Sequence, residues 1–192
     1  MLHKLLNTLL LIVVLLACNS QSYKTVNEID NPLYRTALRF DKSKVWFYDA
    51  SYYSIPYPNG DVPGGGACTD VVIRVLRANH IDLQREVHED MLANFSSYPN
   101  KWGLSKPDPN IDHRRVPNLM VYFERHGWKA DDTWKSGDIV CWELSPGVTH
   151  IGIFMTDESV YHNIGFMARI EKNFLFKYRI IGHYRLKQKT SI

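Results

Sequence analysis

The sequence predicts one α+β domain, in which helices come first along the chain and an antiparallel sheet follows. In the first half, apolar residues recur at helical spacing, as in 69–79, where Val71, Val72, Val75 and Leu76 fall on one face. In the second half, short runs rich in β-branched and aromatic residues alternate with turn residues, which is typical of antiparallel strands.

The elements are expected in the following order along the chain. A capping residue and a proline at 30–32 begin a helix over 33–38, and the aromatic-rich segment 45–55 is a candidate strand. Residues 56–66 contain three Pro and four Gly and therefore predict a loop. Further helices are expected at 69–79, 82–94 and 116–126, with a long loop over 96–112. Strands are expected at 138–144, 149–155, 160–164 and 178–186.

The N-terminus has the features of an export signal. Lys4 precedes an apolar run that is too short for a membrane-spanning helix and ends in Leu15-Leu16-Ala17-Cys18. This tetrad resembles the bacterial lipobox, which predicts that Cys18 carries a lipid; the alternative is an ordinary signal peptide that contains a Cys. We expect a signal peptide at 1–17, a polar tether at 18–27 and a domain at 28–192, held on a membrane of the bacterial cell envelope, on its periplasmic or outer-membrane side.

The charge balance argues against one class of partner, and the remaining cysteines offer either a disulfide or free thiols. A net charge of +3 with no stripe of Lys and Arg argues against nucleic acid as a partner. Besides Cys18, the chain contains Cys68 and Cys141, which either form a disulfide or serve as free thiols with separate roles. Cys141 lies within a predicted strand between Val140 and Trp142, so we expect it to be a buried thiol.

Cys68 is the candidate nucleophile. It stands where the glycines of 64–66 give way to a predicted helix, and the free amides and dipole of a helix N-terminus favour a thiolate. The glycines are expected to let a substrate backbone approach. The alternative is a small apolar residue that begins a helix.

Two histidines are candidate partners of the thiol. In the predicted strand around His150, Ile151 and Ile153 alternate with His150 and Gly152, so we expect His150 to lie on the face away from the core with room above Gly152. A turn with an odd number of residues would place His162 on the same face, where it orients His150 as the third member of a triad. Asn163 is the competing orienting residue, and an ordinary structural histidine is the alternative for each imidazole.

These motifs in this order resemble the NlpC-type branch of papain-like cysteine peptidases, which cleave cell-wall peptides. The matching segments are Pro56-Tyr57, Gly64 to Cys68, Gly137-Asp138-Ile139-Val140, His150-Ile151-Gly152-Ile153-Phe154 and Tyr161-His162-Asn163. The resemblance implies a papain-like fold with N-terminal helices packed on an antiparallel sheet. Cys68 is followed by Thr69-Asp70 where that branch usually has Ser-Gly, and a long insertion over 82–115 separates helix and sheet.

A closer resemblance is to the bacterial "domain of unknown function 1287" family, over about residues 45–185. The segments that carry it are Gly60-Asp61-Val62-Pro63, Cys68 to Arg74, Val87-His88-Glu89-Asp90-Met91, Asn110 to Leu119 and Gly182-His183-Tyr184-Arg185. It supports the fold and implies no particular reaction.

The NlpC-type resemblance also implies roles around the thiol. Tyr57 would lend its hydroxyl to the oxyanion hole beside the Cys68 amide. Apart from the resemblance, Asp70 in the first helical turn is a candidate substrate contact that also suits the helix dipole, and Arg114 and Arg115 are candidates to read a carboxylate of a cell-wall peptide by bidentate hydrogen bonds. The alternative for Tyr57 is a tyrosine packed in a loop. Asp70 would alternatively only stabilise the helix dipole, and Arg114 and Arg115 would belong to a solvated helix start.

Metal sites receive little support from the sequence. The segment Asp108 to Asp112 opens like a calcium loop, but His113 stands where Gly is needed and Leu119 where a Glu belongs. A zinc site built from His113, His150, His162 and His183 lacks the usual spacing. We therefore expect no metal and no cofactor.

The sequence thus predicts an envelope-anchored cysteine hydrolase that cleaves an amide bond, with peptidoglycan stem peptides as the expected substrate. Cys68 attacks, His150 is base and then acid, His162 orients it and Tyr57 assists the oxyanion. The alternatives are an acyltransferase or another amidase with the same residues, or a catalytically silent lipoprotein that binds cell-wall peptide.

Overall fold

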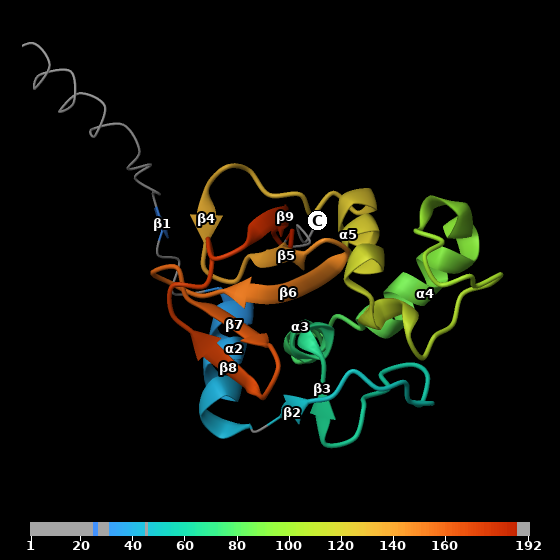
Figure 1. Ribbon diagram of the computed structural model, residues 1–192, viewed down its shortest axis with the longest axis horizontal. Helices are drawn as coiled ribbons and strands as arrows, with labels where there is room; N and C mark the ends of the chain where they lie inside the picture. Colours follow the sequence, from blue (N-terminus) through green and yellow to red (C-terminus); the bar gives the residue numbers. More distant parts are fainter. Residues whose placement is uncertain (1–24, 27–30, 45, 188–192) are drawn as a thin grey trace, which may run out of the picture.

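The computed structural model describes residues 25–26, 31–44 and 46–187, and within them the chain forms an α+β domain (Figure 1). The helices of this part are α2 (Pro32–Ser43), α3 (Cys68–Arg77), α4 (Leu83–Asn94) and α5 (Val116–Arg125), with short 3₁₀ turns at Phe95–Ser97 and Asp112–Arg114. None of these helices is long and apolar enough to cross a membrane.

The five-stranded sheet follows the helices in the chain, as predicted. Its strands are β5 (Ile139–Ser145), β6 (Val148–Phe154), β7 (Val160–Asn163), β8 (Ala168–Glu171) and β9 (Arg179–Tyr184). Their spatial order is β8-β7-β6-β5-β9, and every neighbouring pair is antiparallel. The expected α+β class, with helices on an antiparallel sheet, is therefore confirmed.

Two small parallel pairs lie outside this sheet. The first pair consists of β2 (Phe47–Tyr48) and β3 (Gly65–Gly66). The segment 45–55 was expected to be a strand, but within it only β2 forms one. The pair β1 (Thr25–Val26) and β4 (Trp134–Lys135) includes two residues of the predicted tether. The predicted signal peptide, Cys18 and the rest of the tether lie outside the described residues.

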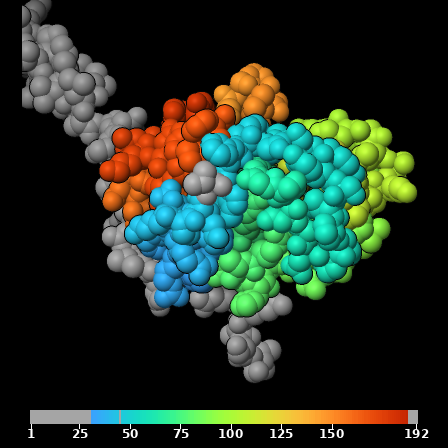
Figure 2. Space-filling model, turned by 90° about the horizontal axis from the view of Figure 1, so that it is seen from below, coloured from blue at the N-terminus to red at the C-terminus, as the bar shows by residue number. Residues whose placement is uncertain are grey.

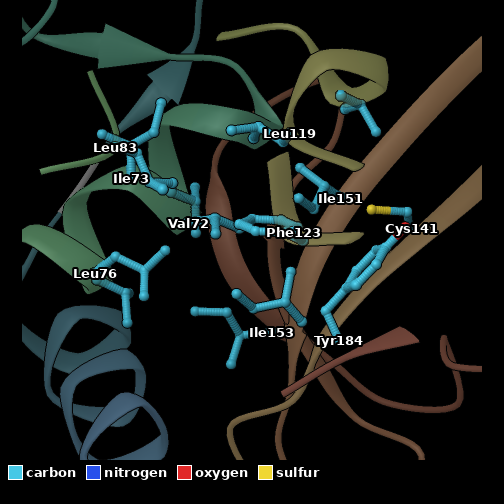
Figure 3. Close-up of a cluster of buried hydrophobic side chains, with 14 of the residues drawn as sticks. Val72, Ile73, Leu76, Leu83, Leu119, Phe123, Cys141, Ile151, Ile153 and Tyr184 are labelled. Carbon is cyan, nitrogen blue, oxygen red and sulfur yellow. The ribbon is translucent and has the colours of Figure 1, made fainter. Parts of the chain in front are cut away.

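Helix α3 is packed against the sheet through the apolar face that the sequence predicts. Val72, Ile73 and Leu76 are buried in the same apolar cluster as Ile151 and Ile153 of β6 (Figure 3). Each such side chain stabilises the fold by about 1.5–3 kcal/mol relative to an exposed position. This packing fixes the N-terminus of α3, and with it Cys68, against the sheet.

The opposite face of the sheet is also covered, by the connection between β8 and β9. Trp142 and Phe154 pack there with Phe174 and Leu175 in a second apolar cluster. Trp142 donates its indole N–H to the Leu175 carbonyl at 2.8 Å. Because strand residues alternate between faces, His150 and His162 lie on this side of the sheet and Ile151 lies on the α3 side.

A long segment crosses the molecule before α3, and we call residues 46–66 the strap. Figure 2 shows it in cyan and turquoise over one face of the protein. The Ile55 amide donates to Asn110 Oδ1 at 3.0 Å, and the Gly60 amide donates to Gln84 Oε1 at 2.7 Å. These bonds connect the strap to α4 and to the loop before α5, so the segment is a tied loop, as its Pro and Gly content predicts.

Candidate active site

Cys68 is the first residue of α3, and its sulfur is enclosed by backbone amides. The N–H groups of Ile151, Thr69 and Cys68 itself favour the thiolate. Burial acts in the opposite direction and is the largest effect; with the nearby Asp70 carboxylate it raises the pKa of the Cys68 thiol to about 11. The expectation that the helix N-terminus produces a thiolate at neutral pH is therefore wrong, because desolvation of the charged sulfur outweighs the amides.

This pKa predicts slow alkylation of Cys68 by iodoacetamide at neutral pH. At pH 7 only about one thiol in 10⁴ is ionised, and the rate is expected to rise about tenfold per pH unit toward pH 11. Peptide mapping by mass spectrometry after timed alkylation measures it. A rate that is already constant between pH 7 and pH 8 would contradict the raised pKa.

Cys141 is the matched control for that measurement. Both cysteines are free, so the disulfide alternative is not formed. Cys141 is fully buried, as predicted, and burial together with the nearby Cys68 raises the pKa of its thiol well above the usual value. We therefore expect native Cys141 to react more slowly than Cys68, and both to react at similar rates in unfolded protein.

The glycines before Cys68 make room for the protein's own side chains. The Ala67 amide donates to Asp70 Oδ2 at 2.6 Å, which caps the start of α3. A Cβ on Gly66 would lie 2.7 Å from the Asp70 Cβ, and a Cβ on Gly65 would lie 2.7 Å from the Phe47 carbonyl oxygen. This packing accounts for Gly65 and Gly66, so the expectation that these two admit a substrate backbone is wrong. A Cβ on Gly64 would meet nothing within 4 Å, so for Gly64 the expectation stays a prediction.

Asp70 and Arg114 form an internal ion pair. Arg114 donates through Nε and Nη2 to the two Asp70 oxygens at 2.9 and 3.0 Å, and through Nη1 to the Ser51 carbonyl at 2.8 Å. The Arg114 side chain is only 2% exposed and the Asp70 side chain only 4%. The predicted substrate contacts of Arg114 and Asp70 are therefore replaced by a structural role, in which the pair joins α3 to the strap.

Arg115 is more open than Arg114, although it also has partners. Its guanidinium lies 4.1 Å from the ring centroid of Trp102, and Nη1 is 3.3 Å from Asp112 Oδ1. Burial lowers the pKa of Arg115, and the carboxylates of Asp112 and Asp108 oppose that shift. Of the predicted substrate-binding residues, Arg115 is the one that keeps exposed area for a ligand.

The two histidines are brought together by the β6–β7 hairpin. Ile153 pairs with Tyr161, and the Met155 amide donates to the Ser159 carbonyl at 2.9 Å, which closes a three-residue turn over 156–158. The turn is therefore odd, as expected, and the imidazoles share one face. Nε2 of His150 and Nδ1 of His162 form a hydrogen bond of 2.8 Å.

Gly152 allows this approach. A Cβ at that position would lie 3.0 Å from the His162 Cβ and 2.7 Å from Cγ1 of Val160. The room that was expected above Gly152 is therefore occupied by β7, the second strand of the hairpin.

Both imidazoles lie in an apolar environment. His150 is 3% exposed and His162 is fully buried, and the Phe174 ring packs edge-on against both. Burial is the main cause that lowers the pKa of each imidazole to about 3. At neutral pH the thiol and both imidazoles are therefore uncharged. They also lie apart, because Cys68 packs on the α3 side of the sheet near Cys141, whereas His150 packs against Trp142 and Phe174 on the opposite side.

Asn163 lies on the other face of β7 and contacts the backbone before Cys68. Its Nδ2 donates to the Gly66 carbonyl at 2.8 Å and to the Trp46 carbonyl at 3.3 Å. The alternation predicted for residues 162 and 163 is thus correct. His162 is the residue that contacts His150, and Asn163 connects β7 to the segment that leads into α3.

Tyr57 does not lie at the thiol. Its ring is 44% exposed and packs edge-on against His88 of α4, with 5.4 Å between the ring centroids. Its predicted role beside the Cys68 amide is therefore corrected. Tyr48 of β2 pairs with Gly66, and burial, followed by the charge of Cys68, raises the pKa of its phenol. Sequence reasoning missed Tyr48, although Trp46-Phe47-Tyr48 was recognised as strand-like.

The histidines of the conceivable zinc site are not assembled. His183 bonds Asp138 Oδ2 at 2.7 Å and stacks on Trp134, whereas His113 is buried in the turn before α5. Within the ranges that the structure describes, no three His, Cys, Asp or Glu side chains are arranged to hold a metal ion.

The sequence matches the family model described as "Domain of unknown function (DUF1287)" over residues 36–186, which is most of the chain. The chain belongs to the DUF1287 family. Cys68, His150 and His162 all fall inside the matched DUF1287 region. A relative of this chain is YijF of Escherichia coli (strain K12), described as an uncharacterized protein. The two are 50% identical over 151 residues, which cover 72% of this chain and 73% of YijF.

A solved structure resembles the fold at a greater distance. It is described as similar to a lipoprotein of the NLP/P60 family and comes from Staphylococcus aureus. The TM-score is 0.42 at 12% sequence identity, and the match covers 89% of this DUF1287 chain. The chain spans about half the length of that protein, with 46% of it covered.

Proposed function

We propose that this protein is a papain-like cysteine hydrolase of the bacterial envelope, tethered through Cys18, that cleaves an amide bond in peptidoglycan stem peptides. The observation that carries the proposal is the hydrogen-bonded histidine pair in the hairpin whose Ile151 amide meets the Cys68 sulfur. The Ile151 amide of β6 bonds Cys68 at the α3 N-terminus, and His162 of β7 bonds the His150 ring, which lies on the opposite face of β6. A cysteine at a helix N-terminus and a histidine oriented by a third group are the components of nucleophilic catalysis, which act together when thiol and imidazole come within hydrogen-bond reach.

The proposed chemistry begins from a neutral site. Cys68 and the His150 ring lie on opposite faces of the sheet, so the proposed reaction requires a movement that brings them together. Nε2 of His150 is engaged by His162, so Nδ1 is the nitrogen that then takes the Cys68 proton as the sulfur attacks the scissile carbonyl. The C–N bond then breaks, and His150 returns the proton to the leaving nitrogen. Water, deprotonated by His150, hydrolyses the thioester and releases a carboxylic acid and the free thiol.

The oxyanion of the tetrahedral intermediate needs hydrogen-bond donors near Cys68. Cys68 is the first residue of α3, where backbone amides have no partner within the helix. We propose that the Cys68 amide donates to the oxyanion and that the Tyr48 hydroxyl takes the place that Tyr57 was expected to fill. Arg115 is the proposed contact for a substrate carboxylate.

A second candidate is a lipoprotein that binds cell-wall peptide without cleaving it. The observation that favours it is the closed, neutral resting state, in which burial raises the pKa of the thiol to about 11 and lowers that of His150 to about 3. The hydrolase accounts better for the His150–His162 bond, because a binding module has no need of an oriented imidazole.

Digestion of purified peptidoglycan separates the two candidates. The full chain is incubated with peptidoglycan and the soluble fragments are identified by mass spectrometry. We expect new amine and carboxylate ends in the stem peptides, which Cys68→Ala does not produce. Binding of stem peptides without any cleavage by the wild-type protein would instead establish the binding module.

A further inference from the structure

We infer that Glu171 of β8 is a positioning residue that fixes the proton positions on the His150–His162 pair, and thereby leaves His150 Nδ1 unprotonated. The inference rests on the proposed function and deepens it. It comes from a line of three contacting side chains that begins at His150 and ends at the edge of the sheet.

The contacts place Glu171 directly behind His162. Strands β7 and β8 are antiparallel, with His162 paired to Arg169 and Val160 paired to Glu171. Oε2 of Glu171 lies 3.5 Å from Nε2 of His162. This nitrogen is buried and has no hydrogen-bond partner among the residues that the structure describes, so the Glu171 carboxylate is the acceptor that the structure places near it. The other ring nitrogen, Nδ1, bonds His150 at 2.8 Å.

Two cations hold the Glu171 carboxylate in place. Arg169 Nη2 donates to Oε2 at 2.6 Å, and Lys177 Nζ donates to Oε1 at 3.3 Å. The Glu171 side chain is 22% exposed, so the group connects the buried histidines to the surface. An ionised carboxylate accepts hydrogen bonds and donates none, which gives the line of side chains a direction.

The direction determines where each imidazole proton lies. Because Glu171 only accepts, the His162 proton belongs on Nε2, and Nδ1 of a neutral His162 is then an acceptor. His150 must therefore donate from Nε2, and Nδ1 of a neutral His150 carries a lone pair. Without Glu171, nothing in the pair itself selects this arrangement over its reverse, in which His150 Nδ1 is protonated and cannot act as a base.

The charges around the pair are consistent with one proton on each ring. Burial, followed by His162, lowers the pKa of His150, and Glu171 opposes that shift. Burial, followed by Arg169 and Lys177, lowers the pKa of His162. Both rings are thus neutral at pH 7, which is the condition under which each nitrogen is either a donor or an acceptor.

Ring nitrogen NMR tests the inference without relying on activity. The full chain is labelled with ¹⁵N-histidine, and the signals are assigned with His150→Gln and His162→Gln. We expect both rings to be protonated on Nε2 in the wild type at pH 7. In Glu171→Ala each ring should become a mixture of molecules protonated on Nε2 and molecules protonated on Nδ1. In Glu171→Gln the form protonated on Nδ1 should also appear, because an amide can donate a hydrogen bond as well as accept one.

Glu143→Gln is the matched control, because Glu143 of β5 pairs with exposed Arg179 away from the histidines and its loss should leave both rings unchanged. If Glu171→Ala does not fold, Glu171→Gln decides. Wild-type ring signals in the folded Glu171 variants would overturn the inference, even if the protein hydrolyses peptidoglycan. Altered signals in a protein that hydrolyses nothing would uphold the proton positions and reject the hydrolase. With both upheld, turnover in Glu171→Ala should fall at least about tenfold with little change in KM.

Discussion

Replacing Cys68 with Ala is expected to reduce hydrolysis of stem peptides by at least about 10³-fold, and adding His150→Ala should lose little more. The thiol is uncharged at neutral pH because burial raises its pKa to about 11, so attack requires that His150 accept its proton in the same step. Nucleophile and base then act as one unit. The losses of hydrolysis rate caused by the two single substitutions are therefore not additive. Comparing the rates of the two single variants with that of the double variant measures this directly.

His162→Ala provides the graded comparison. It should cost less than either change above, because His150 can still sample the productive orientation without its 2.8 Å partner. Circular dichroism of each variant controls for folding, since both histidines are buried. A folded Cys68→Ala protein that hydrolyses at the wild-type rate would show that the thiol is not the nucleophile. Single losses that multiply in the double variant would show that thiol and imidazole work independently.

Arg114→Ala is expected to lower the free energy of unfolding by about 3–5 kcal/mol. The substitution leaves the Asp70 carboxylate buried without its cation, and it removes the Nη1 bond to the Ser51 carbonyl that holds the strap. Arg114→Lys should also destabilise the protein, because one ammonium cannot bond both Asp70 oxygens and the strap together. Urea unfolding followed by circular dichroism measures the change.

Arg179→Ala is the matched control for Arg114. Arg179 pairs with Glu143, but its side chain is 69% exposed, so loss of this pair should cost no more than about 1 kcal/mol. Equal losses for the two variants would contradict the structural role of Arg114. If the Arg114→Ala protein is as stable as the wild type but binds peptide more weakly, the original prediction that Arg114 contacts the substrate would be supported.

The periodic elements and the pairing of the histidines were predictable from the sequence. Apolar spacing located α3 and α5 to within about two residues, and the Asn31 side chain accepts hydrogen bonds from the Leu33 and Tyr34 amides, as the predicted cap requires. Strict alternation in β6 and β7, together with an odd turn, placed His150 and His162 on one face. These features depend on local geometry that a short stretch of sequence contains.

Features that depend on distant partners were not predictable. Strand β8 was missed because its four residues show no clear alternation, and it forms by pairing with β7. The segment 45–55 was expected to be a strand, but it pairs with β3 over only two residues and continues as the strap. Tyr57 was assigned to the thiol by the NlpC-type resemblance, whereas the course of the strap carries it to His88 of α4.

By itself, the sequence determined the order of the elements, the helix that begins at Cys68 and the shared face of the two histidines, because periodicity and alternation are properties of neighbouring residues. Only the tertiary structure decided that Asp70 and Arg114 neutralise each other and that Glu171 stands behind His162. It also decided that the Cys68 thiol is protonated at neutral pH. Burial and ion pairing depend on what surrounds a side chain in space, and residues far apart in the chain supply those surroundings.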